Sequence, residues 1–209
     1  MKIVLASHNQ KKMLEMRRIL SESGMDIEVL TLDDIGYFGD IEETGTTFEE
    51  NSLIKASVPA KLGYIGIADD SGLCVDYLSG APGVYSARYS GPDATDEKNN
   101  DKLLFEMRNA KDTERTARYV TVITLCFPDD RKPLVFSGTC EGKILSSRHG
   151  DGGFGYDPLF WVPEYNKTFA EVGIECKNKI SHRAKAMRAF CEAFAKLIKD
   201  DCLEKIYDK

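Results

Sequence analysis

The chain has 209 residues, of which 42% are hydrophobic and 30% are charged, and its formal net charge is −6. The composition is typical of a globular protein. An acidic balance argues against a general nucleic-acid binder, which normally carries a basic face. No apolar stretch approaches the length of a membrane span. The apolar core of Met1–His8 is too short for a signal peptide. We therefore expect a cytoplasmic protein that binds neither nucleic acid nor membrane.

Strand and helix patterns alternate along the chain. In chain order they predict a strand at 2–6, a helix at 10–23, a strand at 27–32, a helix after Thr47, strands at 64–68 and 73–78, a helix at 95–108, strands at 117–127 and 134–146, and a helix from Ser181 to about Lys199. Pro59 should kink the second helix or end it near Val58. The expected fold is α/β, with a mixed twisted sheet that forms two lobes, helices packed around it and a nucleotide cleft between the lobes. We expect a single two-lobed domain over 1–209.

Two adjacent carboxylates, Asp69 and Asp70, stand in the segment Ala68-Asp69-Asp70-Ser71-Gly72, after the apolar run Tyr64–Ile67. They come at the expected end of a buried strand, where ligands bind in open α/β sheets. An ionised carboxylate taken out of water needs a partner, a metal or a shifted pKa. We interpret this pair as the seat of a divalent cation and its chemistry. An Asx-type turn joining two strands is the alternative.

Two segments ahead of this pair could complete a phosphate and metal site. Ser7–Lys12 forms a polar loop before the first helix, where backbone N–H groups and a lysine suit phosphate oxygens, although for this segment taken alone an ordinary N-cap with solvated lysines is the favoured interpretation. If Glu42 approaches Asp70, the two carboxylates make an oxygen cage for Mg²⁺. Lys55, in the helix that follows, could face the same site or lie on the surface.

Two segments in the second half could bind a base. Gly152–Pro158 is rich in glycine, and Phe154 and Tyr156 offer flat faces for stacking, unless these rings pack into the core. Asp157 could accept hydrogen bonds from ring N–H groups. The head of the last helix, with Lys177 just before it, carries two donors to carbonyl oxygens, His182 and Arg183, although such a triplet with Ser181 is also typical of a surface helix start.

The cysteines show no C-x-x-C spacing, and several fall in apolar strand or helix patterns. We therefore expect buried free thiols rather than disulfides or a zinc site. The six are Cys74, Cys126, Cys140, Cys176, Cys191 and Cys202.

Taken in this order, the segments resemble the inosine triphosphate pyrophosphatase family, the bacterial noncanonical purine nucleoside triphosphate pyrophosphatases. The resemblance covers nearly the whole chain, and seven modest motifs in one order make it specific. The motifs are Ser7-x-Asn9-x-x-Lys12, Glu42-Glu43-Thr44-Gly45, Thr47-Phe48-x-Glu50-Asn51, Ala68-Asp69-Asp70-Ser71-Gly72, Gly83-Val84-Tyr85-Ser86-Ala87-Arg88-Tyr89, Gly152-Gly153-Phe154-Gly155-Tyr156-Asp157-Pro158 and Ser181-His182-Arg183.

The resemblance implies a Mg²⁺-dependent homodimer that cleaves ITP, dITP and XTP to the monophosphate and pyrophosphate, and so removes them from the nucleotide pool. It implies that Glu42 and Asp70 hold the metal and that Asp70 accepts the proton, and we add Asp69 and Lys55 as assisting catalytic groups. The implied contacts to the nucleotide are Ser7, His8, Asn9, Gln10, Lys11, Lys12, Ser71, Phe154, Gly155, Tyr156, Asp157, Lys177, His182 and Arg183.

Three alternatives stay open. A Maf-type pyrimidine nucleotide pyrophosphatase shares this architecture, but that family usually begins with a Ser-x-Ser-x-x-Arg pattern, where this chain has Ser7–Lys12. A nucleotide-binding sensor without turnover need not retain a costly acidic cluster. A single-stranded nucleic-acid binder would use Phe154 and Tyr156, against which the acidic balance counts.

Overall fold

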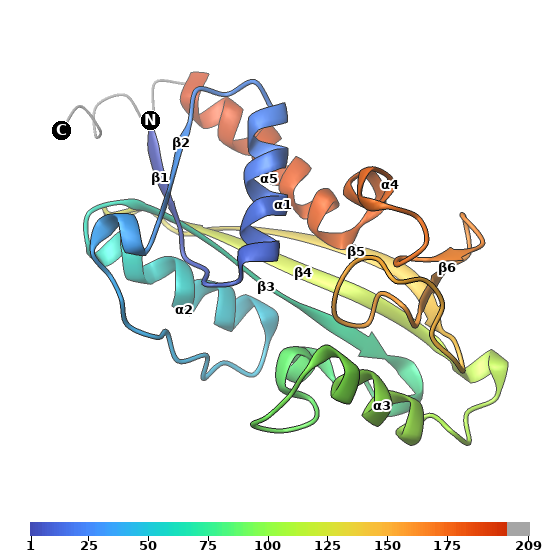
Figure 1. Ribbon diagram of the computed structural model, residues 1–209. Coiled ribbons are helices and arrows are strands. Elements are labelled where there is room, and N and C mark those ends of the chain that lie inside the picture. The colour runs from blue at the N-terminus through green and yellow to red at the C-terminus, as the bar shows by residue number, and fades with distance from the viewer. Residues whose placement is uncertain (200–209) are drawn as a thin grey trace. The chain divides into compact units, whose positions relative to one another are not determined.

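A single mixed sheet organises the computed structural model, which describes residues 1–199 (Figure 1). The strands lie in the order β2-β1-β3-β4-β5-β6-β7. β1 pairs in parallel with β2 and β3, whereas β5 and β6 pair antiparallel. Their bounds are β1 Lys2–Leu5, β2 Glu28–Thr31, β3 Ile65–Val75, β4 Thr116–Cys126, β5 Leu134–Ile144, β6 Phe160–Val162 and β7 Lys167–Thr168. The predicted α/β class with a mixed sheet is confirmed.

Five α-helices accompany the sheet within the described residues: α1 Gln10–Glu22, α2 Phe48–Lys61, α3 Asp96–Glu106, α4 Ile174–Ile180 and α5 His182–Lys199. Short 3₁₀ helices lie at Asp33–Ile35, Asp76–Leu78, Gly83–Arg88 and Asp112–Glu114. Up to Lys199, no helix has both the length and the apolar character needed to cross a membrane.

The helix starts follow the capping signals of the sequence. Asn9 caps α1 by accepting a hydrogen bond from the Lys12 backbone N–H at 3.1 Å. Thr47 and Glu50 form a reciprocal capping box at the start of α2. Both starts were predicted.

The end of α2 differs from the prediction, because the helix continues through Pro59 to Lys61 and does not end near Val58. Pro59 lies in the last turn, so its missing N–H costs only one hydrogen bond near the helix end. Its ring packs against β3 at Gly66, where a Cβ atom would come within 2.6 Å of Pro59 Cγ.

The acidic pair lies inside β3 and not at a strand end, which corrects the expectation of two strands joined near Asp69 and Asp70. β3 runs without interruption from Ile65 to Val75. Nine of its 11 residues are buried. Because both faces of the strand are covered, the segment stays extended where turn chemistry alone would allow a bend.

Two compact units divide the described chain. Unit 1 comprises Met1–Asp70, Val122–Ser137 and the chain from Arg183 onward, and unit 2 comprises Ser71–Thr121 and Gly138–His182. The single two-lobed domain over 1–209 and the nucleotide cleft between its lobes stay predictions.

In unit 1, helices cover both faces of the sheet. Met16 of α1 and Phe190 of α5 pack with Ile3 and Ile67 on one face, where the two helices lie side by side (Figure 1). Ala56 of α2 packs with other residues of β1 and β3, among them Val4 and Ala68, on the opposite face. In unit 2, a separate core contains Leu103, Tyr119, Phe160 and Phe169.

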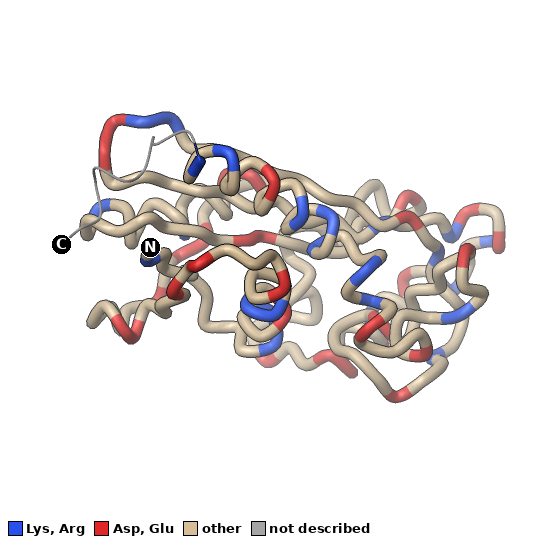
Figure 2. Tube along the Cα trace, turned by 90° about the horizontal axis from the view of Figure 1, so that it is seen from above, with Lys and Arg blue, Asp and Glu red and all other residues tan. Residues whose placement is uncertain are grey.

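Charge and thiols agree with the composition. Figure 2 shows lysines and arginines interspersed with aspartates and glutamates along the described chain. The described cysteines are free thiols, as expected, but only Cys126 and Cys140 are buried, while Cys74, Cys176 and Cys191 are half-buried. Burial raises the pKa of Cys126 to about 11. Cys202 lies outside the described residues.

Candidate active site

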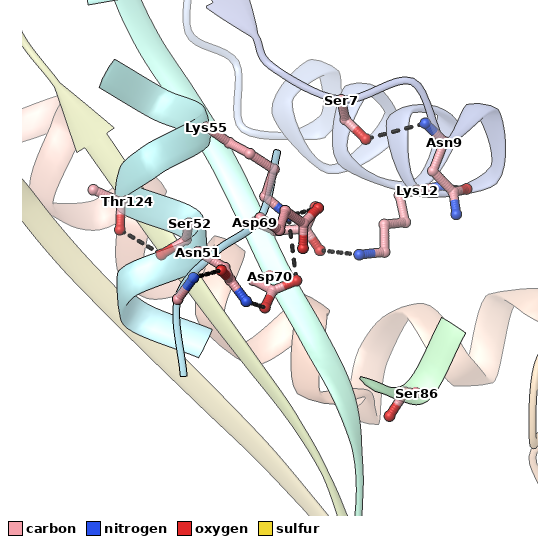
Figure 3. Close-up of polar contacts among 12 residues, drawn as sticks. Ser7, Asn9, Lys12, Asn51, Ser52, Lys55, Asp69, Asp70, Ser86 and Thr124 are labelled. Carbon is pink, nitrogen blue, oxygen red and sulfur yellow. Dashed lines mark hydrogen bonds and ion pairs between the residues drawn. The ribbon is translucent and has the colours of Figure 1, made fainter. Parts of the chain in front are cut away.

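Asp69 and Asp70 are directed to opposite faces of β3, because successive side chains of a strand alternate. Asp69 is 1% exposed and Asp70 is 5% exposed. Asp69 contacts α1 and α5, while Asp70 contacts α2 (Figure 3). One dipeptide therefore places two buried carboxylates in different surroundings.

Two cations neutralise Asp69. Lys12 Nζ lies 3.4 Å from Asp69 Oδ2, and the same oxygen accepts hydrogen bonds from Arg183 Nε at 3.3 Å and Nη2 at 3.4 Å. Arg183 also donates through Nη1 to Glu15 Oε2. Burial alone would raise the pKa of Asp69, but Lys12 and Arg183 outweigh it and hold that pKa well below its usual range.

Lys12 lies in the first turn of α1, and 16% of its side chain is accessible, whereas the neighbouring Lys11 is exposed. Burial outweighs the attraction of Asp69, and so the pKa of Lys12 lies below its usual value. Ser7 shapes the loop before α1 by accepting the Asn9 backbone N–H at 3.2 Å. Three further predicted phosphate contacts, His8, Gln10 and Lys11, are exposed at the start of α1. The exposed helix N-terminus with a lysine beside it suits an anion.

Asp70 meets α2. Its Oδ1 lies 3.2 Å from Lys55 Nζ, and its Oδ2 accepts a hydrogen bond from Asn51 Nδ2 at 3.2 Å (Figure 3). Lys55 and Asn51 share one face of α2 because they are four residues apart. Burial raises the pKa of Asp70, and Lys55 opposes that rise only in part.

Lys55 faces this site and does not lie on the surface, which settles the choice that the sequence left open. Its Nζ also lies 3.0 Å from Glu43 Oε1. Burial alone would lower the pKa of Lys55, but the carboxylates of Asp70, Asp69 and Glu43 outweigh it and raise that pKa. Glu42, the glutamate expected at the metal, is exposed. Two adjacent glutamates in a loop carry no periodicity, so the sequence could not choose between them.

The donor set around Asp70 fits a magnesium ion held by few protein ligands. Up to Lys199, no three Asp, Glu, His or Cys side chains gather as a ready metal site. Mg²⁺, however, is commonly held by one or two carboxylates together with waters and phosphate oxygens. The carboxylates of Glu43 and Asp70 already hold one cation between them, the Lys55 ammonium, and they supply oxygen ligands of the kind that Mg²⁺ takes.

Asp157 organises a second group of predicted residues, which lies in unit 2. This carboxylate is 2% exposed, and its Oδ2 accepts hydrogen bonds from Lys177 Nζ at 2.6 Å and the Phe154 backbone N–H at 2.9 Å. Lys177 Nζ lies 4.3 Å from the centre of the Phe154 ring, a cation–π contact. Gly153 has φ +77°, and a Cβ there would come within 2.1 Å of Asp157 Oδ2, so only glycine fits.

His182 belongs to the same group through an aromatic contact that the sequence did not indicate. Its ring stacks on Tyr119, with centroids 4.7 Å apart and an interplanar angle of 8°. Tyr119 OH lies 3.4 Å from Asp157 Oδ1. Tyr119 looked like an ordinary strand residue, because only the sheet brings it to this loop.

Tyr156 cannot offer a face for stacking, which corrects the interpretation of two stacking rings in the glycine-rich loop. It is 3% exposed, packs within the core of unit 2 and donates a hydrogen bond from its hydroxyl to Ser86 O at 2.8 Å. Phe154 is half-buried and is the aromatic ring of this loop that remains for a base.

The predicted residues thus form two groups, one in each unit. In unit 1 the structure brings together Lys12, Lys55, Asp69, Asp70 and Arg183. In unit 2 it brings together Phe154, Asp157, Lys177 and, through Tyr119, His182. Ser71 follows Asp70 directly in β3 and is half-buried. The sequence reasoning gave no site role to the partners Glu15, Glu43, Asn51 and Tyr119. Glu43 and Asn51 stand in the motifs of the resemblance, whereas only the folded contacts give a signal for Glu15 and Tyr119.

The fold is an α/β sheet that carries a buried acidic pair beside two lysines, Lys12 and Lys55. A family model described as the Ham1 family matches residues 3–193. The chain belongs to the Ham1 family.

Relatives support this assignment. A protein named dITP/XTP pyrophosphatase from Bacillus anthracis is 46% identical over 188 residues, which cover 89% of this chain and 92% of the relative. One of the same name from Geobacter sulfurreducens is 50% identical over 187 residues, covering 89% and 92%. The solved structure of a Ham1 protein from Coxiella burnetii matches with a TM-score of 0.87 at 41% identity, covering 94% of this chain and 99% of that one.

Proposed function

We propose that this chain hydrolyses the noncanonical purine nucleoside triphosphates dITP, XTP and ITP to the nucleoside monophosphate and pyrophosphate. The named relatives, 46% and 50% identical over about nine tenths of the chain, support the reaction class. The observation that carries the proposal is the buried Asp70, whose carboxylate lies 3.2 Å from Lys55 and has a raised pKa. A carboxylate tuned in this way suits a general base.

In this mechanism Asp70 accepts the proton of the attacking water. The water oxygen bonds to the α-phosphorus, the bond from that phosphorus to the bridging oxygen breaks, and pyrophosphate leaves. Lys12 and Lys55 stabilise the charge that develops on the leaving pyrophosphate. Asp69 holds Lys12, since their charged groups are 3.4 Å apart. The exposed start of α1, from Ser7 to Lys12, binds the phosphate oxygens.

Glu42 and Asp70 would hold Mg²⁺, with Glu43 beside them. When bound, the ion supplies charge neutralisation on the triphosphate and a lowered pKa of a coordinated water. Mg²⁺ dependence, assembly as a homodimer and a place in the cytoplasm are further parts of this proposal, and they rest on the resemblance of the motifs.

Base selection belongs to the group in unit 2 and to the head of α5. Phe154 stacks on the base, and His182 and Arg183 donate to the oxygen at position 6, which adenine lacks. A site built to hydrogen-bond one group can reject an analogue without it by up to roughly 10⁴-fold. The contacts of Arg183 with Asp69 and Glu15 require it to exchange partners when it binds the base.

Pyrophosphate release from ITP, XTP, ATP, GTP and dTTP, each with Mg²⁺ and with a chelator, tests the proposal. Fast Mg²⁺-dependent release from ITP and XTP, with little from ATP and GTP, is expected. A preference for dTTP would assign the chain to Maf-type chemistry. Binding of ITP without turnover of any triphosphate would leave a sensor and would exclude Asp70 as a working base.

A further inference from the structure

We propose that Asp96 and Asn100 of α3 are positioning residues for base recognition, because they hold the glycine-rich loop from outside. The contacts to the loop exist in the free protein. Only their expected effect on kinetics rests on the proposed function. All the residues involved belong to unit 2.

Both peptide groups that flank the Gly155 Cα atom are bound by α3. The Gly155 backbone N–H donates to Asp96 Oδ2 at 2.8 Å, and its carbonyl oxygen accepts from Asn100 Nδ2 at 2.9 Å. Asp96 and Asn100 are four residues apart and therefore share one face of the helix. Asn100 is 3% exposed, so its amide is fixed in orientation, whereas Asp96 lies in the exposed first turn.

The loop needs this support because Gly155 itself is conformationally free. Its φ is +61°, and apart from Gly155 itself and its two chain neighbours no atom lies within 4 Å of the position that a Cβ would take. A glycine moves between backbone regions at little steric cost. The two hydrogen bonds from α3 therefore help to hold the peptide groups of Gly155 in one orientation.

Neighbouring contacts carry the constraint to the ring that would stack on the base. The backbone N–H of Phe154 donates to Asp157. The carbonyl end of Phe154 belongs to the peptide group whose N–H, that of Gly155, donates to Asp96. The Phe154 ring lies over Lys177 Nζ. The α3 contacts therefore help to set the position of Phe154 without touching a substrate.

The kinetic experiment compares Asp96→Ala, Asn100→Ala and the double variant. We expect each single variant to raise KM for ITP about fivefold, the usual effect of one lost hydrogen bond, with kcat changed less than about twofold. Because both act through Gly155, the double variant should fall short of the product of the two effects. Asp96→Asn, whose amide oxygen can still accept, should restore most of the loss.

Glu97→Ala is the matched control. It removes the same charge from the same turn of α3, and the Glu97 side chain is hydrogen-bonded to Thr95 at the start of the helix. Inorganic pyrophosphate probes the residues of unit 1 that are proposed to bind the triphosphate. Its inhibition constant should be unchanged in all variants. An unchanged KM in both single variants, or a parallel shift in pyrophosphate inhibition, would overturn the proposal.

Amide hydrogen exchange tests the same contacts without any turnover. Asp96→Ala should speed exchange at Gly155 about tenfold and leave the amides of β4 unchanged, because only the loop loses a partner. Unchanged exchange at Gly155 would refute the support role even in a protein that hydrolyses ITP. Absence of ITP hydrolysis in the wild type, with faster exchange in the variant, would refute the proposed function alone.

Discussion

Asp69 and Asp70 are sequence neighbours whose pKa values move in opposite directions. The pKa of Asp69 is lowered by Lys12 and Arg183, while burial raises that of Asp70. The alternation of side chains along β3 produces the difference, since it directs one carboxylate to α1 and α5 and the other to α2. A permanently ionised anchor and a titratable base thus come from one dipeptide.

Replacing Asp70 with Asn removes the proton acceptor but keeps the shape of the side chain. Turnover of ITP should fall on the order of 10²-fold or more, since general-base catalysis contributes at least that much. Steady-state release of pyrophosphate measures the loss, with the exposed Asp130→Asn as a control of equal charge change. Near-normal turnover of the Asp70 variant would remove this residue from the role.

The raised pKa of Asp70 predicts how activity depends on pH. Because the folded pKa of Asp70 lies above its usual value of 3.8, the base becomes protonated at a higher pH than an exposed aspartate would. The value of kcat/KM for ITP should therefore fall as pH decreases through that raised pKa, while Asp69 stays ionised. A profile that stays flat down to pH 3.8 would contradict Asp70 as the base.

At the scale of elements, the sequence predicted the helix starts and strands that depend on neighbouring residues alone. Asn9 and the Thr47–Glu50 capping box marked the starts of α1 and α2, and alternation marked β4 and β5. The unbroken β3 was not predicted, because Asp-Ser-Gly is ordinary turn chemistry and only cover on both faces keeps it extended. The separate helix α4 was also missed, since seven residues are too few for a clear helical period.

The residues of the candidate site also fall into those that the sequence predicted and those that it did not. The residue types in the motifs identified Asp69, Asp70, Lys12 and the Gly152–Pro158 loop, because costly groups stand out in a sequence. Partners such as Glu15 and Tyr119 could not be found, because their part in the site depends on which helix face or strand face meets it.

The approach of α2 to β3 depends on a missing side chain at Gly66. A Cβ there would lie 2.1 Å from Ala56 O and 2.6 Å from Pro59 Cγ, so the helix would have to move. Gly66→Ala should destabilise the protein by about 1–3 kcal/mol, the usual cost of overpacking. Urea unfolding measures the change, with Gly39→Ala as control, because its Cβ would meet nothing closer than 3.4 Å. Equal midpoints for both variants would show that α2 adjusts freely.

At the scale of the whole molecule, the boundaries between the two units fall inside strands. Unit 1 passes to unit 2 after Asp70 in β3, and the other two sheet boundaries fall after Thr121 in β4 and after Ser137 in β5. Independent domains are usually joined by exposed linkers that few contacts cross. Three shared strands therefore predict one cooperative unfolding transition for both units.

The single tryptophan, Trp161, lies in unit 2 and provides the test. Met16 is a fully buried residue of α1 in unit 1, so Met16→Ala should cost about 2–5 kcal/mol. If the units unfold together, this variant lowers the urea midpoint of Trp161 fluorescence as much as that of far-ultraviolet circular dichroism. Leu14→Ala on the same helix, where the side chain is 67% exposed, should leave both midpoints nearly unchanged. In Met16→Ala, the midpoint of Trp161 fluorescence could stay unchanged while the circular dichroism midpoint falls. That result would mean that the shared strands break at the boundaries and that the units unfold separately.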